Sequence, residues 1–310
     1  MASVDMSILI VCYKSRDLIQ QCLEGVYAYT SGCTFEVLIV DCSNDGAVDL
    51  VKEKFPAARV IENSENLGFG RGNNLLADHA NGTFLVLLNP DVIVSDNAIG
   101  LLCQTAMSHP EAGAVGGRSK LPNGMRDPGC RQWIPTISRM LIETFGGAKL
   151  LNGCLPEDAK GPAEVETLSG AFMIVRRDAW REANGFDTSF FMYSEELDLC
   201  YRLRKNGWTI LMTPLAEVIH LVGGGQGQNP NRVRMITTAK MHFLRKYWSR
   251  PQAILGGVII WCHGLIRVLL GTFGGLVLGR DRAFKLRNAY KTIVFQPRNW
   301  WFGFQGGPIN

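Results

Sequence analysis

The chain has 310 residues, 46% of them hydrophobic and 19% charged. This composition excludes a disordered chain without a hydrophobic core, and the length allows one large α/β domain plus an appendage. The net charge of +4 hides an asymmetry, because the residues from Lys240 onward carry 11 Lys and Arg and one acidic residue, against 21 and 27 before them. A basic tail on an acidic body indicates an anionic partner, either a lipid surface or a nucleic acid.

Short apolar runs alternate with helical patterns over the first 116 residues. Strands are expected at Met6–Tyr13, Phe35–Asp41, Arg59–Glu62, Thr83–Leu88 and Ala112–Gly116. Helices are expected at Ser15–Tyr29, Val48–Lys54, Phe69–His79 and Asp96–Met107. This alternation at short spacing predicts a doubly wound, mostly parallel sheet.

The second half of the chain is less regular. The part from Gly117 to Glu164 is rich in Gly and Pro and is expected to form a long loop over a site. Order resumes at Glu166–Val175, with helices expected at Glu195–Asn206 and Asn231–Trp248 and strands at Trp208–Met212 and Val218–His220.

Polar residues follow three of the apolar strand patterns. They are Cys12 and Tyr13 after the first, Asp41 at the end of the second, and Asn89-Pro90-Asp91 after the fourth. Open α/β sheets bind ligands at the carboxyl ends of their strands, so these residues are candidates for a site. The alternative is that the aspartates cap helices or make turns, which we favour for Asp45 but not for Asp41 or Asp91.

A glycine-rich stretch, Asn66–Asn74, opens the predicted helix at Phe69–His79. Such a segment can bring backbone N–H groups close to a ligand, and it can equally be only a tight turn. A dinucleotide fingerprint belongs after the first strand, where this chain has no glycine, so a nicotinamide dehydrogenase is disfavoured.

Acidic residues and a histidine follow later strands. Glu195, Glu196 and Asp198 stand at the start of a predicted helix, where they either favour the helix dipole or supply a general base. His220 ends a strand and is followed by Gly223–Gly225, so it is either a structural residue or a ligand beside a mobile loop.

Seven segments resemble, in order and spacing over about residues 6–225, the inverting family 2 glycosyltransferases of the rhamnosyltransferase-like branch. They are ILIVCYKS, FEVLIVDCSNDG, ENLGFGRGNN, LVLLNPDV, LSGAFMIVRRDAW, GFDTSFFMYSEELDLCYRLRKNGW and AEVIHLVGGG. The resemblance implies a GT-A fold, a nucleotide diphosphate sugar donor and a divalent metal, Mg²⁺ or Mn²⁺.

The resemblance also implies roles for individual residues. Glu196 matches the catalytic base, with Glu195 as the alternative, and Asp91 and His220 match metal ligands. The nucleotide-sugar pocket is expected to involve Cys12, Tyr13, Asp41, Asn66, Gly68, Asn73, Asn89, Gly170 and Ala171. The family's metal motif and its base position differ here, because Asn89 replaces a carboxylate and Glu196 stands where Asp is usual.

These features predict a metal-dependent hexosyltransferase that moves a sugar, with L-rhamnose the first choice, to a lipid-linked or cell-envelope glycan by a single inverting displacement. A retaining route would need a nucleophile on the opposite face, and we identify none. The alternative is a catalytically silent nucleotide-sugar-binding or scaffold subunit. A nucleic-acid partner is disfavoured because interleaved aromatics and a recognition motif are missing, and homo-oligomerisation is left open.

The tail after Trp248 is apolar and basic, so we divide the chain into a GT-A domain at 1–248 and a membrane-associating segment at 249–310. Its uninterrupted apolar pieces, Ala253–Cys262 and Val268–Leu278, are each too short to span a bilayer. His263 and Arg267 share one helix face, which favours an in-plane or re-entrant helix on an anionic membrane. The alternative is a helix packed against the catalytic domain or a partner subunit.

The cysteines and the N-terminus bear on localisation. Nine cysteines are scattered without a C-x-x-C pair, which suits a reducing compartment. The apolar run Met6–Cys12 is too short for a secretion signal. We therefore expect a peripheral or re-entrant protein at the cytoplasmic face of the inner or plasma membrane, and we expect the catalytic domain to fold without the part after Trp248.

Overall fold

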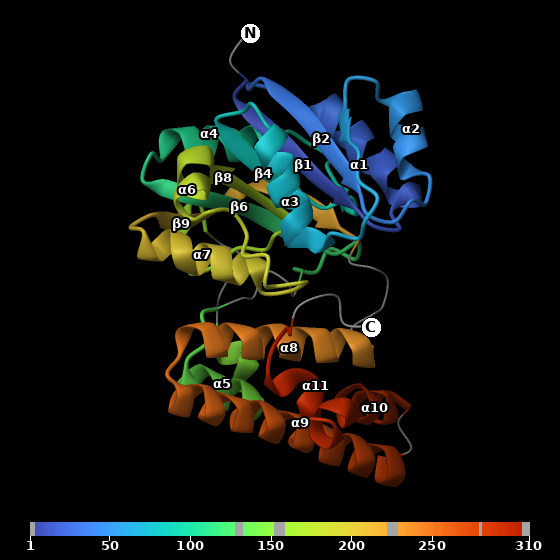
Figure 1. The fold of residues 1–310 in the computed structure, drawn as a ribbon, viewed down its shortest axis with the longest axis vertical. Helices are drawn as coiled ribbons and strands as arrows, with labels where there is room; N and C mark the ends of the chain where they lie inside the picture. The colour runs from blue at the N-terminus through green and yellow to red at the C-terminus, as the bar shows by residue number, and fades with distance from the viewer. Residues whose placement is uncertain (1–3, 128–132, 152–158, 222–228, 279–280, 306–310) are drawn as a thin grey trace. The chain divides into compact units, whose positions relative to one another are not determined.

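The computed structural model describes residues 4–127, 133–151, 159–221, 229–278 and 281–305 of the chain (Figure 1). The chain folds into two compact units. The first comprises Met1–Ile134, Gly153–Thr188 and Glu196–Gly223, and the second comprises Pro135–Asn152, Ser189–Glu195 and Gly224–Asn310. The second unit therefore contains the expected tail at 249–310 together with three earlier stretches of the chain, Pro135–Asn152, Ser189–Glu195 and residues 224–248.

The first unit is built on one sheet with the strand order β3-β2-β1-β4-β8-β6-β9-β5, and β7 pairs with β9. The strands are β1 Met6–Cys12, β2 Phe35–Asp41, β3 Arg59–Ile61, β4 Phe84–Leu88, β5 Val92–Ile93, β6 Ala112–Lys120, β7 Ala163–Glu164, β8 Phe172–Arg176 and β9 Thr209–His220. The strands β3, β2, β1 and β4 are parallel, whereas β8 is antiparallel to both β4 and β6. The predicted α/β class is confirmed, and the antiparallel β8 makes the sheet mixed.

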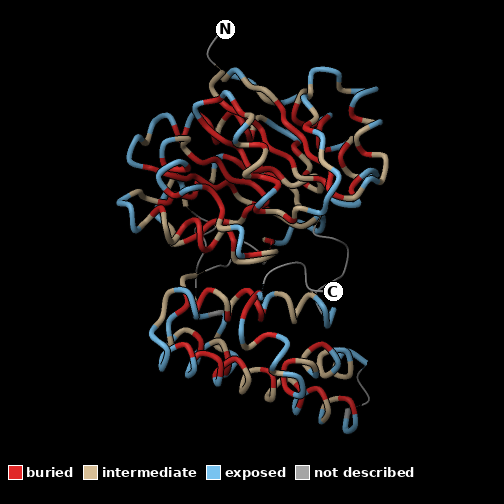
Figure 2. The backbone as a smooth tube through the Cα atoms, in the orientation of Figure 1, coloured by how far each residue is buried: buried red, intermediate tan, exposed pale blue. Residues whose placement is uncertain are grey.

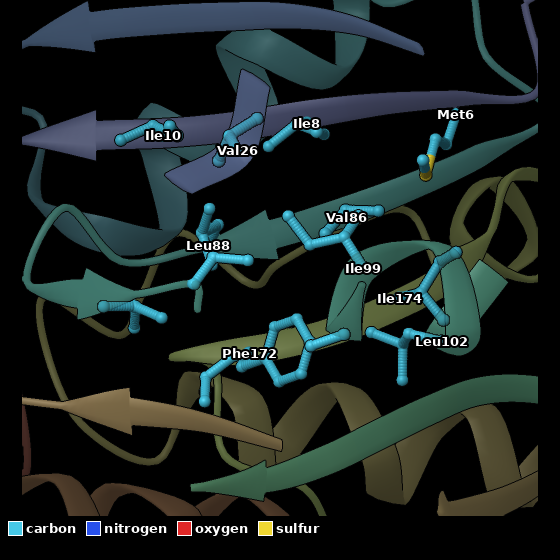
Figure 3. Packing of buried hydrophobic residues seen from close by; sticks show 14 of the residues in the cluster. Met6, Ile8, Ile10, Val26, Val86, Leu88, Ile99, Leu102, Phe172 and Ile174 are labelled. Atoms are coloured by element: carbon cyan, nitrogen blue, oxygen red, sulfur yellow. The ribbon is translucent and has the colours of Figure 1, made fainter. Parts of the chain in front are cut away.

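Helices cover both faces of this sheet, as the nearly all-apolar strands require. They are α1 Arg16–Tyr29, α2 Ala47–Lys54, α3 Gly68–His79, α4 Ala98–Ser108, α6 Arg177–Glu182 and α7 Glu195–Lys205. The first residue of α7, Glu195, is assigned to the second unit. Because side chains alternate along a strand, Ile8 and Ile10 enter one core cluster and Leu9 enters the other. Figure 3 shows Ile8 and Ile10 in the first cluster.

Several element boundaries differ from the expected ones. The two strands expected at Trp208–Met212 and Val218–His220 are one strand, β9, which contains Pro214. The pairing of β9 with β6 shifts in register between Gly116 and Arg118, opposite the part of β9 that contains Pro214. Without the shift this proline, which has no N–H, would interrupt the ladder of hydrogen bonds. Within Glu166–Val175 only the part from Phe172 is a strand. The Gly223–Gly225 segment lies outside the described residues.

The second unit is helical. Its elements are α5 Ile137–Thr144, the 3-10 helix η2 Gly147–Leu150, α8 Pro230–Tyr247, α9 Arg250–Leu278, α10 Asp281–Phe295 and α11 Arg298–Trp301. A Cβ atom at Gly257, Gly264 or Gly271 would lie within about 3 Å of α11 or α10, so these glycines let the helices pack closely on α9. Among the described residues, α9 alone is long and apolar enough to cross a membrane, by length and composition only.

Candidate active site

The ends of β1 and β2 lie side by side, as Cys12 pairs with Asp41 in the parallel register. Asp41 is 7% exposed, and its carboxylate accepts hydrogen bonds from the N–H and Oγ of Ser43 and from the N–H of Asn44, at 2.9–3.1 Å. A carboxylate offers about four lone-pair positions, so Asp41 keeps acceptor capacity beyond its own loop. Asp41 is therefore both a turn-making residue and a candidate ligand contact.

A polar pocket of about 700 Å³ opens beside this loop, between the end of β2, α2 and β3. Its lining includes Asp41, Asn44, Glu62 and Asn63, the last of which donates from Nδ2 to the carbonyl of Asp41 at 3.3 Å. The volume lies within the range of small-molecule sites. Asn63 was not among the residues predicted from the sequence, because a single asparagine after a short strand carries no distinctive signal.

The other residues of the first two loops have different surroundings. Cys12 is fully buried in the core, and burial raises the pKa of its thiol to about 12. Tyr13 is 48% exposed. Asp45 makes the turn that we favoured for it, because its carboxylate accepts from the N–H groups of Arg16 and Ala47 at 3.0 and 3.1 Å.

Packing and backbone conformation account for the glycines of the Asn66–Asn74 segment. Gly68 has φ +70° and donates its N–H to Oδ1 of Asn66 at 3.1 Å. A Cβ atom at Gly72 would lie 2.8 Å from a methyl carbon of Val11, so α3 approaches β1 closely there. The tight-turn interpretation is thus sufficient for these glycines.

Asn73 behaves differently from the glycines around it. It is 1% exposed, and its Nδ2 donates to the carbonyl of Phe69 at 3.0 Å. Its Oδ1 is buried and has no hydrogen-bond partner within the described part of the chain. A buried amide oxygen without a partner is costly, which makes Asn73 a candidate for a ligand contact or a bound water.

The Asn89-Pro90-Asp91 turn brings Asp91 to His220. The N–H of Val92 donates to the carbonyl of Asn89, and the N–H of Leu221 donates to the carbonyl of Asp91. Nε2 of His220 lies 3.2 Å from Oδ1 of Asp91, and both side chains are partly accessible, at 12% and 19%. The two residues matched to metal ligands are therefore adjacent.

A second carboxylate holds the other side of the His220 ring. Nδ1 of His220 lies 2.7 Å from Oδ2 of Asp127, whose side chain is 3% exposed. Burial by itself lowers the pKa of His220, but the hydrogen bonds and charges of Asp127 and Asp91 outweigh it and raise the pKa to about 9. Asp127 was missed in the sequence because it lies in the stretch read as an irregular loop and is 93 residues from His220.

The donor set fits a hard divalent cation with few protein ligands. Asp91 offers an oxygen and His220 offers Nε2, while Asp127 is placed to orient the ring in the manner of a carboxylate–histidine–metal triad. No group of three or more His, Cys, Asp or Glu side chains with metal-binding geometry occurs within the described ranges. Such an ion would complete its coordination with substrate phosphates and water.

Gly170 and Ala171, just before β8, lie close to Glu196 of α7 and to Asn89, respectively. The N–H of Asn89 donates to the carbonyl of Ala171 at 3.0 Å. A Cβ atom at Gly170 would lie 3.0 Å from the Phe69 ring and 3.7 Å from Cβ of Glu196. Gly170 therefore lies between α3 and the start of α7, and Glu196 is linked through Gly170 and Ala171 to the Asn89 turn.

The two neighbouring glutamates differ in accessibility. Glu195 is 4% exposed, whereas Glu196 is half-buried. The residues before them, Tyr193 and Ser194, have φ +68° and +63°, a left-handed conformation that costs about 1–2 kcal/mol per residue. This conformation differs from the extended one usual for an N-cap, so Ser194, the residue before α7, is not a typical N-cap. Such strain at a helix entry is typical of functional sites.

Asp198 has a structural role. It is fully buried, and its Oδ2 accepts from Nε of Arg202 at 2.7 Å, one helical turn later. The guanidinium of Arg202 also donates to the carbonyl of Ala183. Asp198 thus anchors α7 to the end of α6 through an ion pair.

Comparisons with known proteins give the chain a family. A family model described as glycosyltransferase-like family 2 matches residues 4–247. The "N-acetylglucosaminyl-diphospho-decaprenol L-rhamnosyltransferase" of Mycobacterium tuberculosis is 28% identical over 242 residues, which cover 73% of this chain and 78% of that protein. The "Rhamnosyltransferase WbbL" of Escherichia coli K12 is 23% identical, covering 69% of this chain and 82% of that protein.

Solved structures share the fold. A mannosyltransferase from Pyrobaculum calidifontis, in complex with GDP-Man and Mn²⁺, has a TM-score of 0.62 at 16% identity. That similarity covers 97% of this chain and 88% of the mannosyltransferase. The predicted GT-A type architecture is therefore confirmed.

Proposed function

Because the chain belongs to the glycosyltransferase-like family 2, we propose that it transfers a sugar from a nucleotide diphosphate donor to a lipid-linked or cell-envelope glycan, with inversion at the anomeric carbon. The observation that carries this proposal is the link from the Asp91–His220 pair through Asn89 and Ala171 to Gly170 and Glu196. This link brings two candidates to one edge of the sheet: the Asp91–His220 pair, which would lie at the donor diphosphate, and Glu196, the candidate base.

Glu196 is proposed as the general base. The acceptor hydroxyl gives its proton to the Glu196 carboxylate while its oxygen forms a bond to the anomeric carbon. The bond from that carbon to the nucleotide diphosphate breaks in the same step, so the configuration inverts. Glu196 suits this role better than Glu195, because it is half-buried beside Gly170 while Glu195 is 4% exposed.

Asp91 and His220 would hold a divalent cation, Mg²⁺ or Mn²⁺, at the diphosphate of the donor. The ion, when bound, would supply positive charge that stabilises the leaving diphosphate. Asp127 would keep the ring of His220 in one orientation and keep its Nδ1 protonated, and the cation would bind at Nε2 in place of the proton that the raised pKa retains there. The pocket beside Asp41 would receive the nucleoside.

The donor is proposed to be a deoxythymidine diphosphate L-rhamnose, with uridine-linked sugars as the runner-up. The support is the 28% identical relative named as an L-rhamnosyltransferase acting on a diphospho-decaprenol glycolipid. A lipid-linked acceptor would place the protein at a membrane, and we propose the cytoplasmic face. The seven cysteines of the described residues are all free, which supports a reducing compartment.

The experiment is transfer of labelled sugar from a panel of nucleotide sugars to a polyprenyl-diphosphate-linked N-acetylglucosamine, with Mg²⁺, Mn²⁺ or a chelator. Transfer from one donor, lost with the chelator, is expected, and the anomeric configuration of the product tests inversion. Donor binding in a thermal-shift assay without turnover on any acceptor would instead favour a silent nucleotide-sugar-binding subunit.

A further inference from the structure

The outward face of α9 exposes apolar side chains near both ends of the helix, and the residues from Ile259 to Val268 between them are buried or partly buried. Its large exposed side chains are Ile254, Leu255, Val258, Leu269, Leu270, Phe273, Leu276 and Val277. Because a helix turns about 100° per residue, these positions fall on one side, and we call them the α9 stripe. Leu269, Phe273 and Leu276 are 59%, 63% and 74% exposed. Figure 2 shows exposed residues recurring along this helix.

The opposite face of α9 carries the glycines and the charge. Gly264 and Gly271 pack against α10, where a Cβ atom would meet Ile293 at 3.0 Å and the Ala283 carbonyl at 2.6 Å. Arg267 donates to the carbonyls of Thr144 and Glu143 at 3.0 and 3.4 Å, at the C-terminal end of α5. The same face buries Ala253, Ile260 and Val268, so α9 is apolar on both sides, whereas the outer face of a helix in water is normally polar.

Other parts of the second unit are also apolar on the outside. The exposed large side chains of α5, of η2 and of the turn between them are Leu141, Ile142, Phe145 and Leu150. Val258 of the stripe lines an apolar hollow of about 380 Å³ with Trp261, Trp301 and Arg298. Tryptophan and arginine at the border of an apolar surface are typical of a membrane interface.

We propose that α9 inserts its stripe into one leaflet of a bilayer while lying parallel to the membrane surface and not crossing it. The proposal rests on the membrane location given under the proposed function, and it names the surface that makes the contact. So many exposed large apolar side chains on one side of a helix are unusual for a water-soluble unit and mark an interaction surface.

The position of α10 argues against a spanning helix. It runs back along the inner face of α9, since Gly264 meets Ile293 and Gly275 meets Phe284. Its own outward side exposes Arg282, Lys285 and Lys291. If α9 crossed the bilayer, α10 would carry these charges into hydrocarbon, which is costly for each of them. When α9 lies flat, the same charges stay in water behind it.

The charges also favour an anionic lipid surface over a second protein. The outward side of α10 carries three basic residues and one acidic residue, Asp281. Helix axes in contact are about 8–10 Å apart, which is close to the Debye length of about 10 Å at 0.1 M salt. Attraction to anionic headgroups therefore adds to insertion of the stripe and does not replace it. We expect binding to neutral vesicles to persist and anionic lipid to strengthen it in a salt-dependent way.

The first test is flotation of the full-length protein with vesicles of phosphatidylcholine, with and without 30% phosphatidylglycerol, roughly the anionic content of many membranes. Leu269→Glu combined with Phe273→Glu is expected to lower vesicle partitioning by about tenfold or more, because two apolar insertions are lost. Met107→Glu, at a 54% exposed position of α4, is the matched control and should float like the wild type. Equal flotation of the double variant and the wild type would overturn the proposal.

The second test separates lying from crossing. A genetically encoded nitroxide amino acid at Leu255, Leu269 or Leu276 reports depth by power saturation. A flat helix gives similar shallow depths at all three positions, and a label at Lys285 stays in water. A maximum of depth at Leu269 would mean a spanning helix. Self-association of the wild type without vesicles, abolished in the Leu269/Phe273 variant, would mean a second copy of the chain on the stripe. Either result contradicts the proposal.

A third measurement keeps this proposal separate from the proposed function. Transfer to a short-chain, water-soluble acceptor without vesicles should be equal in the wild type and the Leu269/Phe273 variant. If neither form transfers sugar but flotation differs as expected, the membrane surface stands and the transferase proposal fails. If both forms transfer sugar and neither floats, the transferase proposal stands and the membrane surface fails.

Discussion

At the scale of single residues, the two glutamates at the start of α7 have unequal access to a substrate. Glu195 is 4% exposed, while Glu196 is half-buried beside Gly170. The family position and the accessibility therefore both favour Glu196 as the base. Tyr193 and Ser194, just before the two glutamates, have a left-handed backbone conformation.

Glu196→Gln is expected to lower the rate of transfer by about 10²–10⁴-fold, because the amide cannot accept the acceptor's proton. Donor affinity should change little, since the substitution keeps the shape of the side chain. Steady-state transfer and calorimetric donor binding check the two parts. Glu195→Gln is the matched control, and an inactive Glu195→Gln beside an active Glu196→Gln would move the base to Glu195.

The pair formed by His220 and Asp127 gives a second prediction at this scale. Asp127→Asn should weaken Mn²⁺ binding, in the presence of the nucleoside diphosphate, by about 10–100-fold, because it removes the carboxylate that orients the ring. Asp91→Ala and His220→Ala should abolish the metal dependence of diphosphate binding. Calorimetry with and without Mn²⁺ measures all three, and unchanged metal dependence in His220→Ala would remove that residue from the site.

At the scale of elements, close helix packing determines where glycine is needed. Gly72→Ala would place a Cβ atom 2.8 Å from Val11, so overpacking should lower the free energy of unfolding by about 1–3 kcal/mol. Gly161→Ala, with nothing within 4 Å of the added Cβ, is the neutral control. Urea unfolding measures both, and the Val11→Ala background should recover part of the loss. Equal stability of the two alanine variants would argue against close packing of α3 on β1.

The inner face of α9 gives a pH prediction. Burial, and the positive charges of Arg267 and Lys240, lower the pKa of His263 to about 4. The negative charge of Glu143 opposes this shift. The ring of Tyr290 lies against the His263 ring. The unfolded chain therefore binds this proton over the window from pH 6.5 to about 4, and the folded unit does not. Stability should rise with pH across this window and fall as the pH drops through it.

His263→Gln tests this linkage. Between pH 6.5 and 4 the free energy of unfolding should fall less steeply with decreasing pH in the variant than in the wild type. The two slopes should differ by up to about 1.4 kcal/mol per pH unit, the value for one proton. Parallel profiles for the two proteins would mean that His263 does not contribute to acid sensitivity.

At the scale of the whole molecule, the second unit includes more than the tail after Trp248. In α8, Met241, Phe243 and Leu244 are at most 1% exposed, and Leu244 packs where Gly256 of α9 has no side chain. Trp261 of α9 donates to the carbonyl of Val294 in α10. We therefore no longer expect the chain to fold cleanly without the part after Trp248.

Truncation after Trp248 should remove α9, α10 and α11 from α5 and α8 and expose the apolar faces that they cover. We expect a protein that aggregates or binds a hydrophobic dye, even though the sheet of the first unit is intact. Size-exclusion chromatography and dye binding check this against the full-length chain. A soluble, monomeric truncated protein with α8 still protected from hydrogen exchange would show that α8 does not need α9.

The sequence by itself determined the alternation of the main strands and helices from β1 to β6, the family, and most of the candidates for the site. These properties depend on local patterns: apolar runs such as Phe35–Asp41, and polar residues such as Asn89–Asp91 that stand where a strand ends. Local spacing is enough for them, because strand and helix periodicities extend over only a few residues.

Only the tertiary structure decided the contacts between distant segments. It paired Asp127 with His220 across 93 residues, and it inserted β8 antiparallel between β4 and β6, so that Ala171 meets Asn89. It also turned Arg267 toward α5 and left the apolar side of α9 outward. Such pairings depend on which surfaces meet after the chain has folded, and no local pattern of side chains specifies the partner.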